Sequence, residues 1–177
     1  MHAAKYVPIS YRTPSPAEII ARRTARDLKI PTAAAIQIAA PEMAALIDGP
    51  CWLVPVPASN GSLIANLALA RAIPELVIGV RVKCAIGRAY PVESSASRRI
   101  RGLPGLTVQQ HALIRTVGPI MLWPVYFVDN VITTGTTIAA CRRALGWGVG
   151  LAFADASRGS HVPRFGTGLD RCLALAR

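Results

Sequence analysis

The segment that most constrains the fold is residues 125–137, which read Val-Tyr-Phe-Val-Asp-Asn-Val-Ile-Thr-Thr-Gly-Thr-Thr. Bulky β-forming residues precede two polar side chains, and a Thr/Gly loop then leads into residues with helical periodicity. A buried strand that delivers such a loop to a helix N-terminus places backbone N–H groups and the helix dipole where a phosphate binds. We therefore expect a strand over 120–131, a phosphate-binding loop, and a helix over 137–145 that Gly146 ends.

A second strand, polar loop and helix precede this unit. Residues 51–56 form a short, continuously apolar run that is typical of a buried parallel strand, with prolines at its exit. Turn residues follow at 58–62, and apolar residues at helical spacing predict a helix over 63–73. In parallel sheets, ligands bind beyond the carboxyl ends of the strands at the point where the strand order reverses. Both polar loops are expected at such ends.

The rest of the chain completes an alternation of strands and helices. We expect a loose arm at 1–15, helices over 16–29, from 32 to 40 and over 41–48, and strands at 76–82 and 149–154. Residues 84–111 lack a clear period and carry several arginines, which favours a flexible basic loop or hairpin with a short helix near 108–115. The segment 158–168 is expected to be a loop. The pattern predicts a single α/β domain over 1–177, with a parallel sheet flanked by helices in a Rossmann-like three-layer arrangement.

Composition limits the functional classes. The net charge of +11 favours an anionic partner, and either a polyphosphate ligand or nucleic acid would satisfy it. Apolar runs are too short for a membrane span and the N-terminus lacks a signal-type stretch, so we expect a soluble cytoplasmic protein that binds no membrane. The four cysteines form no close pair and the histidines do not complete metal-ligand spacing, which predicts buried free thiols and no metal site built from protein ligands.

The 133–137 loop has chemistry matched to a phosphate monoester. It offers consecutive N–H groups and several hydroxyls, and Gly135 lets the backbone approach closely. Asp129 and Asn130 come just before it, and their oxygens accept hydrogen bonds from the vicinal hydroxyls of a sugar. The alternative is a plain Thr/Gly turn in which Asp129 caps the helix.

The 125–137 motif resembles the phosphoribosyl pyrophosphate (PRPP) motif of type I phosphoribosyltransferases, in which four hydrophobic residues precede two acids and a Thr-Gly-x-Thr loop. A looser likeness extends over about 51–156 and is similar to the ComF-like branch, which shares a Pro-Val-Pro strand exit and an arginine-bearing loop. The resemblance implies a ribose-binding role for Asp129 and Asn130, and a Mg²⁺ ion bridged mainly through ligand oxygens. It also implies a closing loop at 84–111 and a pyrophosphate loop of unusual peptide geometry. The implied 5′-phosphate ligands are Thr133, Thr134, Gly135, Thr136 and Thr137; the implied pyrophosphate ligands are Ala58, Ser59, Asn60, Gly61, Ser62, Lys83, Arg98, Arg99 and Arg101.

The chain departs from that family pattern in three places. Asn130 stands where members usually carry a second acid, so it adds no negative charge. Thr133 stands where the purine-salvage enzymes have an acidic base, and the first fifty residues hold no cysteine for the zinc module of ComF-like proteins. Two functions therefore stay open: transfer of a phosphoribosyl group from PRPP to an unidentified acceptor, and a catalytically weak or inactive protein with a regulatory or nucleic-acid-binding role. A nucleotide monophosphate as ligand, a protein partner and a homodimer are also left open.

Some residues outside the loops have weaker signals. His111, at the end of the basic segment, is expected to be a surface residue. Asp155 and Arg158 follow a predicted strand and are alternatives for a nucleobase pocket. The three tryptophans, Trp52, Trp123 and Trp147, are expected in the core or at an interface.

Overall fold

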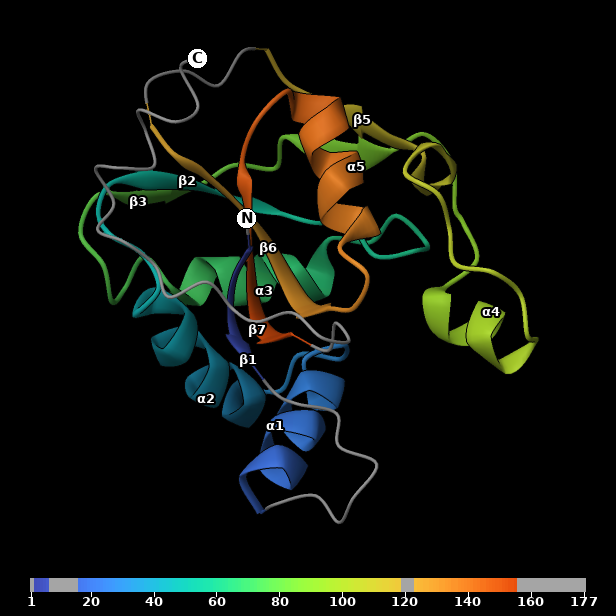
Figure 1. Ribbon diagram of the computed structural model, residues 1–177. Helices are drawn as coiled ribbons and strands as arrows, with labels where there is room; N and C mark the ends of the chain where they lie inside the picture. Colours follow the sequence, from blue (N-terminus) through green and yellow to red (C-terminus); the bar gives the residue numbers. More distant parts are fainter. Residues whose placement is uncertain (1, 7–15, 119–122, 156–177) are drawn as a thin grey trace.

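A twisted parallel sheet forms the centre of the molecule. The computed structural model describes residues 2–6, 16–118 and 123–155. Within them, five strands lie in the order β1-β7-β6-β2-β3, and every neighbouring pair is parallel (Figure 1). Their bounds are β1 His2–Tyr6, β2 Cys51–Pro55, β3 Val80–Val82, β6 Val125–Ile132 and β7 Val149–Asp155. The prediction of an α/β chain with a parallel sheet flanked by helices is confirmed.

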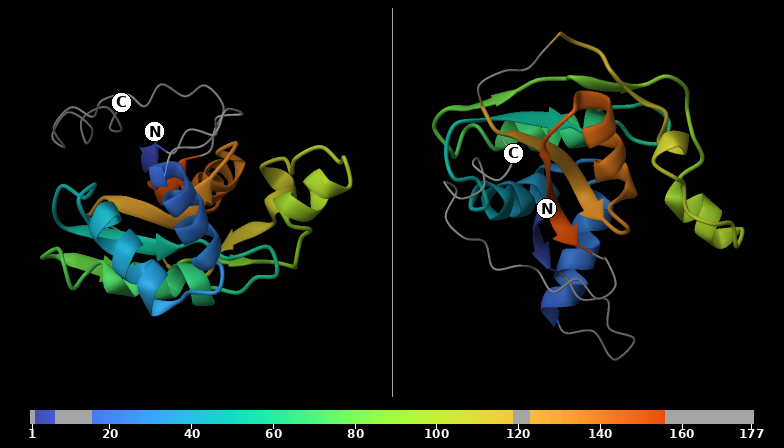
Figure 2. Two further views of the ribbon diagram at one scale, coloured as in Figure 1. Left: turned by 90° about the horizontal axis from the view of Figure 1, so that it is seen from below. Right: turned by 45° about the horizontal axis from the view of Figure 1, so that its top comes forward.

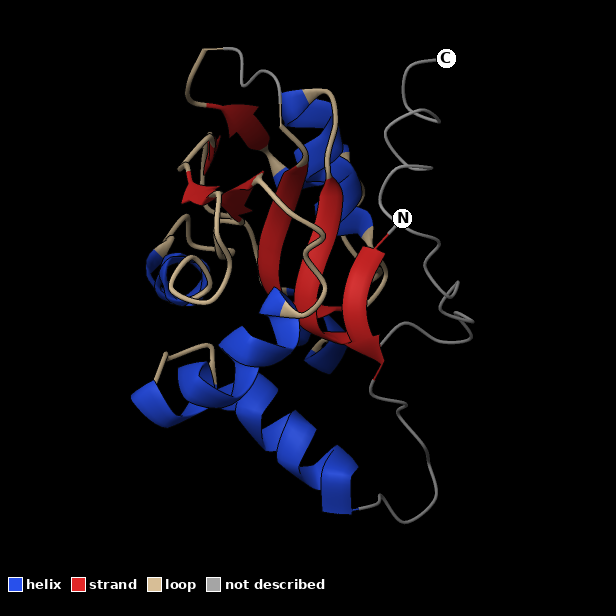
Figure 3. Cartoon of the chain, turned by 90° about the vertical axis from the view of Figure 1, so that its left-hand side faces the viewer, coloured by secondary structure: helices blue, strands red, loops and turns tan. Residues whose placement is uncertain are grey.

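Helices cover both faces of this sheet. Helices α1 (Pro16–Asp27), α2 (Ala33–Ala44) and α3 (Ile64–Ala72) pack into one apolar core, and α5 (Thr136–Leu145) packs into the other (Figure 3). Alternation along the strands explains the two cores, because successive side chains of a strand point to opposite faces. Leu53 lies in the first core and Val54 in the second. Both faces are therefore buried, which accounts for the near-continuous apolar runs of β2 and β6.

The segment between β3 and β6 contains a smaller sheet. Strands β4 (Ile86–Arg88) and β5 (Leu113–Arg115) pair in antiparallel fashion, and α4 (Ser95–Ile100) and the 3₁₀ turn Gln109–His111 lie between them. In each view, α4 stands away from the central sheet at the end of this long connection (Figure 2). The expected loop or hairpin is thus an ordered hairpin with an inserted helix, and the short helix predicted at 108–115 is only the 3₁₀ turn.

Several predicted boundaries are wrong. Residues 2–6 belong to an edge strand beside β7 rather than to a loose arm, because the backbone pairs in parallel with β7. The two helices expected at 32–40 and 41–48 are one helix, α2, that continues through Pro41. The strand expected from residue 76 begins only at Val80, since Leu76 and Ile78 lie in turns with exposed side chains.

Some predictions about individual side chains also change. Ile19, Ile20 and Leu28 are expected to face inward; Leu28, just after α1, is buried, whereas Ile19 and Ile20 are exposed and α1 buries Ala21 and Ala25. Cys51 and Cys141 are buried, as expected, whereas Cys84 is exposed. Residues 7–15 of the expected N-terminal arm lie outside the described residues. The same holds for residues 156–177, which include Arg158 and Cys172. No helix in the described part of the chain is both long and apolar enough to cross a membrane.

Candidate functional site

The strand order reverses between β2 and β6. From β2 the chain passes outward to β3, then returns to β6 on the other side of β2 and continues to β7. Residues 52–55 of β2 pair directly with residues 125–128 of β6, so the loops that follow these two strands leave the same edge of the sheet. A crevice at such a reversal is where open parallel sheets bind ligands. The topology therefore places loops 58–62 and 133–137 at the edge where open parallel sheets bind ligands.

The 133–137 loop opens onto the N-terminus of α5. Gly135 is the N-cap residue with a φ of 75°, a conformation that glycine adopts without steric cost, and no side chain caps the helix. The hydroxyls of Thr134 and Thr136 lie 2.9 Å apart. The N–H groups of Thr134 and Gly135 have no acceptor among the described residues. The loop thus combines free N–H donors, two hydroxyls and the positive end of a helix dipole.

The 58–62 loop is held by bonds to its carbonyl oxygens. Ser62 O accepts from Ala58 N at 2.8 Å, Ala58 O accepts from Gly61 N at 2.9 Å, and Ser59 O accepts from Val92 N at 2.8 Å. The N–H groups of Ser59 and Asn60 find no acceptor within the part of the chain that the structure describes. Three carbonyls of the loop are occupied and two of its amide donors are free, which suits an anion. The unusual peptide geometry that the resemblance implied is not present as a cis bond, since none occurs in the described residues.

Asp129 lies between the two loops. It is inside β6, and its Oδ1 accepts hydrogen bonds from Asn130 N at 2.8 Å and from Asn66 Nδ2 at 3.3 Å. Asn66 is buried on α3 and also donates to Val56 O at 2.8 Å, so it links the end of β2 to Asp129. Burial raises the pKa of Asp129 from 3.8 to about 6, against the opposing effects of these bonds and of the Arg88 charge.

Asn130 has a different environment from Asp129. Neighbouring residues of a strand point to opposite faces, and Asn130 Nδ2 donates to Ala25 O of α1 at 3.2 Å. The structure therefore brings Asp129 to Asn66, and Asn130 to α1. Asp129 and Asn130, which the sequence presented as one sugar-binding unit, therefore bond to two different helices.

Arg88, at the end of β4, joins segments that are far apart in the sequence. Its guanidinium donates to Ala58 O at 2.6 Å, to Pro57 O at 3.2 Å and to His111 O. These bonds attach the 58–62 loop to the β4–β5 hairpin. Sequence reasoning counted Arg88 only as one charge of a basic loop. The apolar pair before it, Ala85-Ile86, which is buried in the α5 core, was the available signal that this arginine begins inside the fold.

His111 is buried, and the prediction of a surface histidine is wrong. Its side chain lies under the 133–137 loop, where Nε2 is 3.3 Å from Thr136 Oγ1, and only 3% of the residue is exposed. Nδ1 is buried without a hydrogen-bond partner among the described residues. Burial, reinforced by the Arg88 charge, lowers the pKa of His111, so the ring is neutral at pH 7.

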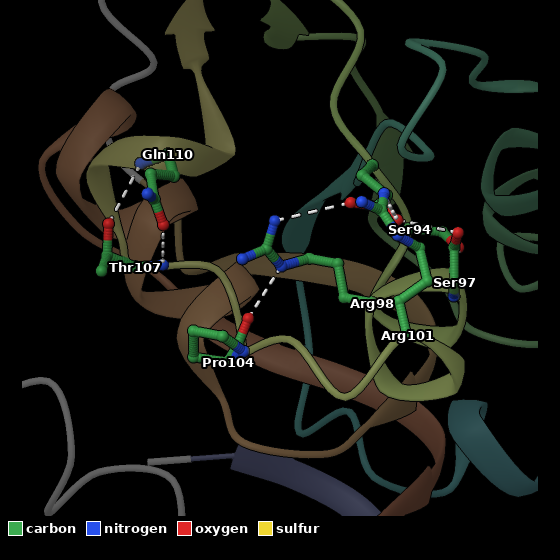
Figure 4. Close-up of polar contacts among 8 residues, drawn as sticks. Ser94, Ser97, Arg98, Arg101, Pro104, Thr107 and Gln110 are labelled. Atoms are coloured by element: carbon green, nitrogen blue, oxygen red, sulfur yellow. Dashed lines mark hydrogen bonds and ion pairs between the residues drawn. The ribbon is translucent and has the colours of Figure 1, made fainter.

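The arginines of α4 lie apart from both loops. Arg98 pairs with Glu93 at 3.6 Å and donates to Pro104 O at 2.8 Å, and Arg101 donates to Glu93 at 3.0 Å (Figure 4). The hydrogen bond that the Ser97 hydroxyl donates to Glu93, together with the charges of Arg101 and Arg98, lowers the pKa of Glu93. Arg99 is exposed. Three of the predicted pyrophosphate ligands thus belong to α4 or, in the case of Arg101, follow it directly, and α4 stands away from the central sheet (Figure 2).

Lys83 points away from the loops as well. Its ammonium lies 5.5 Å from the centre of the Trp52 ring, and Trp52 is the second residue of β2, whereas loop 58–62 follows the last. Trp52 in turn lies 5.6 Å from Trp123, over which Arg81 is placed at 5.0 Å. This cation–aromatic cluster at the β3 edge agrees with the expected structural role of these tryptophans.

The side chains at the site fit a metal ion that takes most of its ligands from water molecules and phosphate groups. In the described residues, no group of three or more histidine, cysteine, aspartate or glutamate side chains is close enough to hold a metal ion. Asp129 supplies a carboxylate beside both loops. Mg²⁺ is commonly bound by one or two carboxylates together with substrate phosphates and water.

Comparison with known proteins adds no relative. The chain matches no family model, no curated protein and no solved structure. The likeness of residues 125–137 to the PRPP motif therefore depends on those residues and on their geometry.

Replacing Arg88 by methionine is expected to lower the free energy of unfolding by about 2 kcal/mol. Three carbonyls lose a charged donor, and a buried acceptor left without a partner costs about 1 to 3 kcal/mol, less where water reaches it. Chemical denaturation measures the change. The control is Arg143→Met, which removes an exposed guanidinium from α5 and should change stability by less than about 0.5 kcal/mol. Equal stability of the two variants would contradict the bridging role of Arg88.

Proposed function

We propose that this chain is a phosphoribosyltransferase-like protein that binds PRPP, or the ribose 5-phosphate part of a nucleotide, together with Mg²⁺. The observation that carries the proposal is the pair of loops with free amide donors on neighbouring strands at the reversal of strand order, with Asp129 between them. Two separate loops with free donors suit a ligand that carries phosphate groups at both ends of a polar ring better than they suit a single phosphate.

In this proposal the 133–137 loop binds the 5′-phosphate. The N-terminus of α5, the N–H groups of Thr134 and Gly135 and the two threonine hydroxyls favour negative charge. The 58–62 loop binds the pyrophosphate through its free N–H groups. Asp129 accepts hydrogen bonds from the ribose hydroxyls, while Asn130 has a smaller part because its amide is bonded to α1.

Transfer of the phosphoribosyl group is the reaction that such a site supports. The bond between ribose C1 and the pyrophosphate oxygen breaks, its electron pair leaves with pyrophosphate, and a nucleophile on the acceptor forms the new bond to C1. The chain's own residues bind both phosphates, hold the ribose between them and place the Asp129 carboxylate near the developing positive charge. Mg²⁺, when bound, neutralises pyrophosphate charge, with Asp129 as the protein carboxylate that could hold it directly or through water.

Isothermal titration of PRPP with Mg²⁺ tests the proposal. Wild-type protein should bind, and Asp129→Ala should bind at least about tenfold more weakly, since hydrogen bonds to a charged group contribute about 1.5 to 3 kcal/mol. Asp48→Ala is the matched control, because Asp48 is exposed and precedes β2, at the opposite edge of the sheet from the loops. Absent binding in the wild type, or equal binding in wild type and Asp129→Ala, would remove the proposal.

A regulatory or nucleic-acid-binding function is the second candidate. The exposed Arg99 and the projection of α4 from the body favour it, as does the net charge of +11. Binding of single-stranded DNA that weakens steeply with salt and is unchanged in Asp129→Ala would support this candidate. Retention of that binding after charge reversal at Arg98, Arg99 and Arg101 would exclude α4 as its site.

A further inference from the structure

A chain of three polar side chains connects the interior to the 133–137 loop. His111 Nε2 lies 3.3 Å from Thr136 Oγ1, and Thr136 Oγ1 lies 2.9 Å from Thr134 Oγ1. His111 is buried, Thr136 is partly buried and Thr134 is exposed at the loop surface. Each hydroxyl has one proton to donate, so the direction of donation at one end of this chain determines the direction at the other.

The surroundings of His111 select one tautomer. Nδ1 is buried and has no partner among the described residues, so a proton there would be a buried donor without an acceptor. Among backbone groups, buried N–H donors without an acceptor are rarer than under-satisfied acceptors, and we apply the same preference to the ring. Burial, and then the nearby Arg88 charge, lower the pKa of His111 and so oppose a second proton on the ring. The neutral ring with its proton on Nε2 is therefore favoured, and Nε2–H donates to Thr136 Oγ1.

Donation from His111 directs the Thr136 proton to Thr134 and the Thr134 proton out of the loop. Thr136 Oγ1 accepts from the imidazole, so its own proton is available to Thr134 Oγ1 at 2.9 Å. Thr134 Oγ1 also accepts from Thr136 N at 3.5 Å, which leaves the Thr134 hydroxyl proton free to point out of the loop. The opposite tautomer would reverse the chain and present oxygen lone pairs to an arriving anion.

We propose that His111 is a positioning residue that, through the Thr136 hydroxyl, orients the Thr134 hydroxyl as a donor to an anionic group bound at the N-terminus of α5. This inference rests on the proposed function and adds a residue to it that no motif in the sequence marks. His111 does not touch the phosphate; it acts through Thr136. The hydroxyl chain gives a role to a histidine from the β4–β5 segment whose side chain is buried beneath the loop.

Two measurements on the full chain test the proposal. Long-range ¹H–¹⁵N NMR reports which ring nitrogen carries the proton, with the His111 signals assigned by their loss in His111→Gln. Titration with ribose 5-phosphate compares wild type with His111→Met, which removes the donor, and with His111→Gln, which keeps an amide donor at similar reach. We expect the Nε2–H tautomer, about fivefold to tenfold weaker binding in His111→Met, and near wild-type binding in His111→Gln.

A double-mutant cycle separates orientation from a general structural effect. In Thr136→Val the chain is already broken, so adding His111→Met should cause no further loss of ribose 5-phosphate affinity. An Nδ1–H tautomer, full affinity in His111→Met, or additive losses in the double variant would each overturn the inference while the proposed function stands. Failure of the wild-type protein to bind ribose 5-phosphate would overturn both.

Discussion

Replacing Asp129 by asparagine is expected to raise the free energy of unfolding by about 2 to 3 kcal/mol at pH 7. Burial raises the pKa of Asp129 from 3.8 to about 6, so the folded protein holds the proton more tightly than the unfolded chain does. Tighter proton binding stabilises the folded wild-type protein fully below about pH 4, and this stabilisation is lost as pH rises through about 6. Asparagine stays neutral, and its Oδ1 accepts the same bonds from Asn66 and Asn130.

Denaturation of both proteins between about pH 3 and about pH 8, a range that includes both pKa values, measures this difference. Stabilities should coincide near the lower limit, diverge through about pH 6 and then differ by a constant amount. Asp48→Asn is the control, since an exposed carboxylate should change stability by less than about 0.5 kcal/mol at each pH. A constant difference at all pH values would show that Asp129 titrates normally. A variant that is more stable yet binds PRPP weakly would identify Asp129 as a residue kept for function.

Replacing Gly148 by alanine is expected to lower the free energy of unfolding by about 3 to 5 kcal/mol. Gly148 has a φ of +130°, which a residue with a side chain rarely adopts, and a Cβ there would lie 2.6 Å from two ring atoms of Phe127. Phe127 is fully buried beside α5, so the ring cannot move without disturbing the core. Backbone strain of about 1 to 3 kcal/mol adds to an overpacking cost of about 1 to 3 kcal/mol.

Two glycines separate these contributions in thermal or chemical unfolding. Gly146 has a φ of +99°, and a Cβ added there would meet open space. Gly146→Ala should therefore lower the free energy of unfolding by the backbone strain alone, about 1 to 2 kcal/mol. Gly105→Ala also meets nothing within 4 Å and lacks a positive φ, so its change should be below about 0.5 kcal/mol. Gly148→Ala combined with Phe127→Leu should lose less than the sum of the single changes. Similar losses at Gly146 and Gly148 would show that the contact with Phe127 is unimportant.

Local periodicity was enough to predict most of the central sheet and its helices. The apolar runs before Pro57 and Asp129 are long enough and β-branched enough to predict buried strands, and α5 begins and ends within one residue of its predicted limits. Errors occur where pairing or packing outweighs local pattern. The edge strand β1 has no apolar run, and α2 continues through Pro41. The residues from Ala33 onward already form a helix before Pro41 is reached. The helix also buries Ala39, Ala40 and Met43, which lie on both sides of that proline.

The candidate site was also predictable from the sequence only in part. Residues 125–137 by themselves determined a strand that ends at a loop with free donors and a helix N-terminus, because those features depend on neighbours within a few positions in the chain. Only the tertiary structure decided which other side chains meet there. Asn66, Arg88 and His111 come from α3, β4 and the 3₁₀ turn, and their bonds to Asp129, Ala58 and Thr136 span 63, 30 and 25 positions. Such contacts depend on how distant segments cross at one edge of the sheet, which no local pattern records.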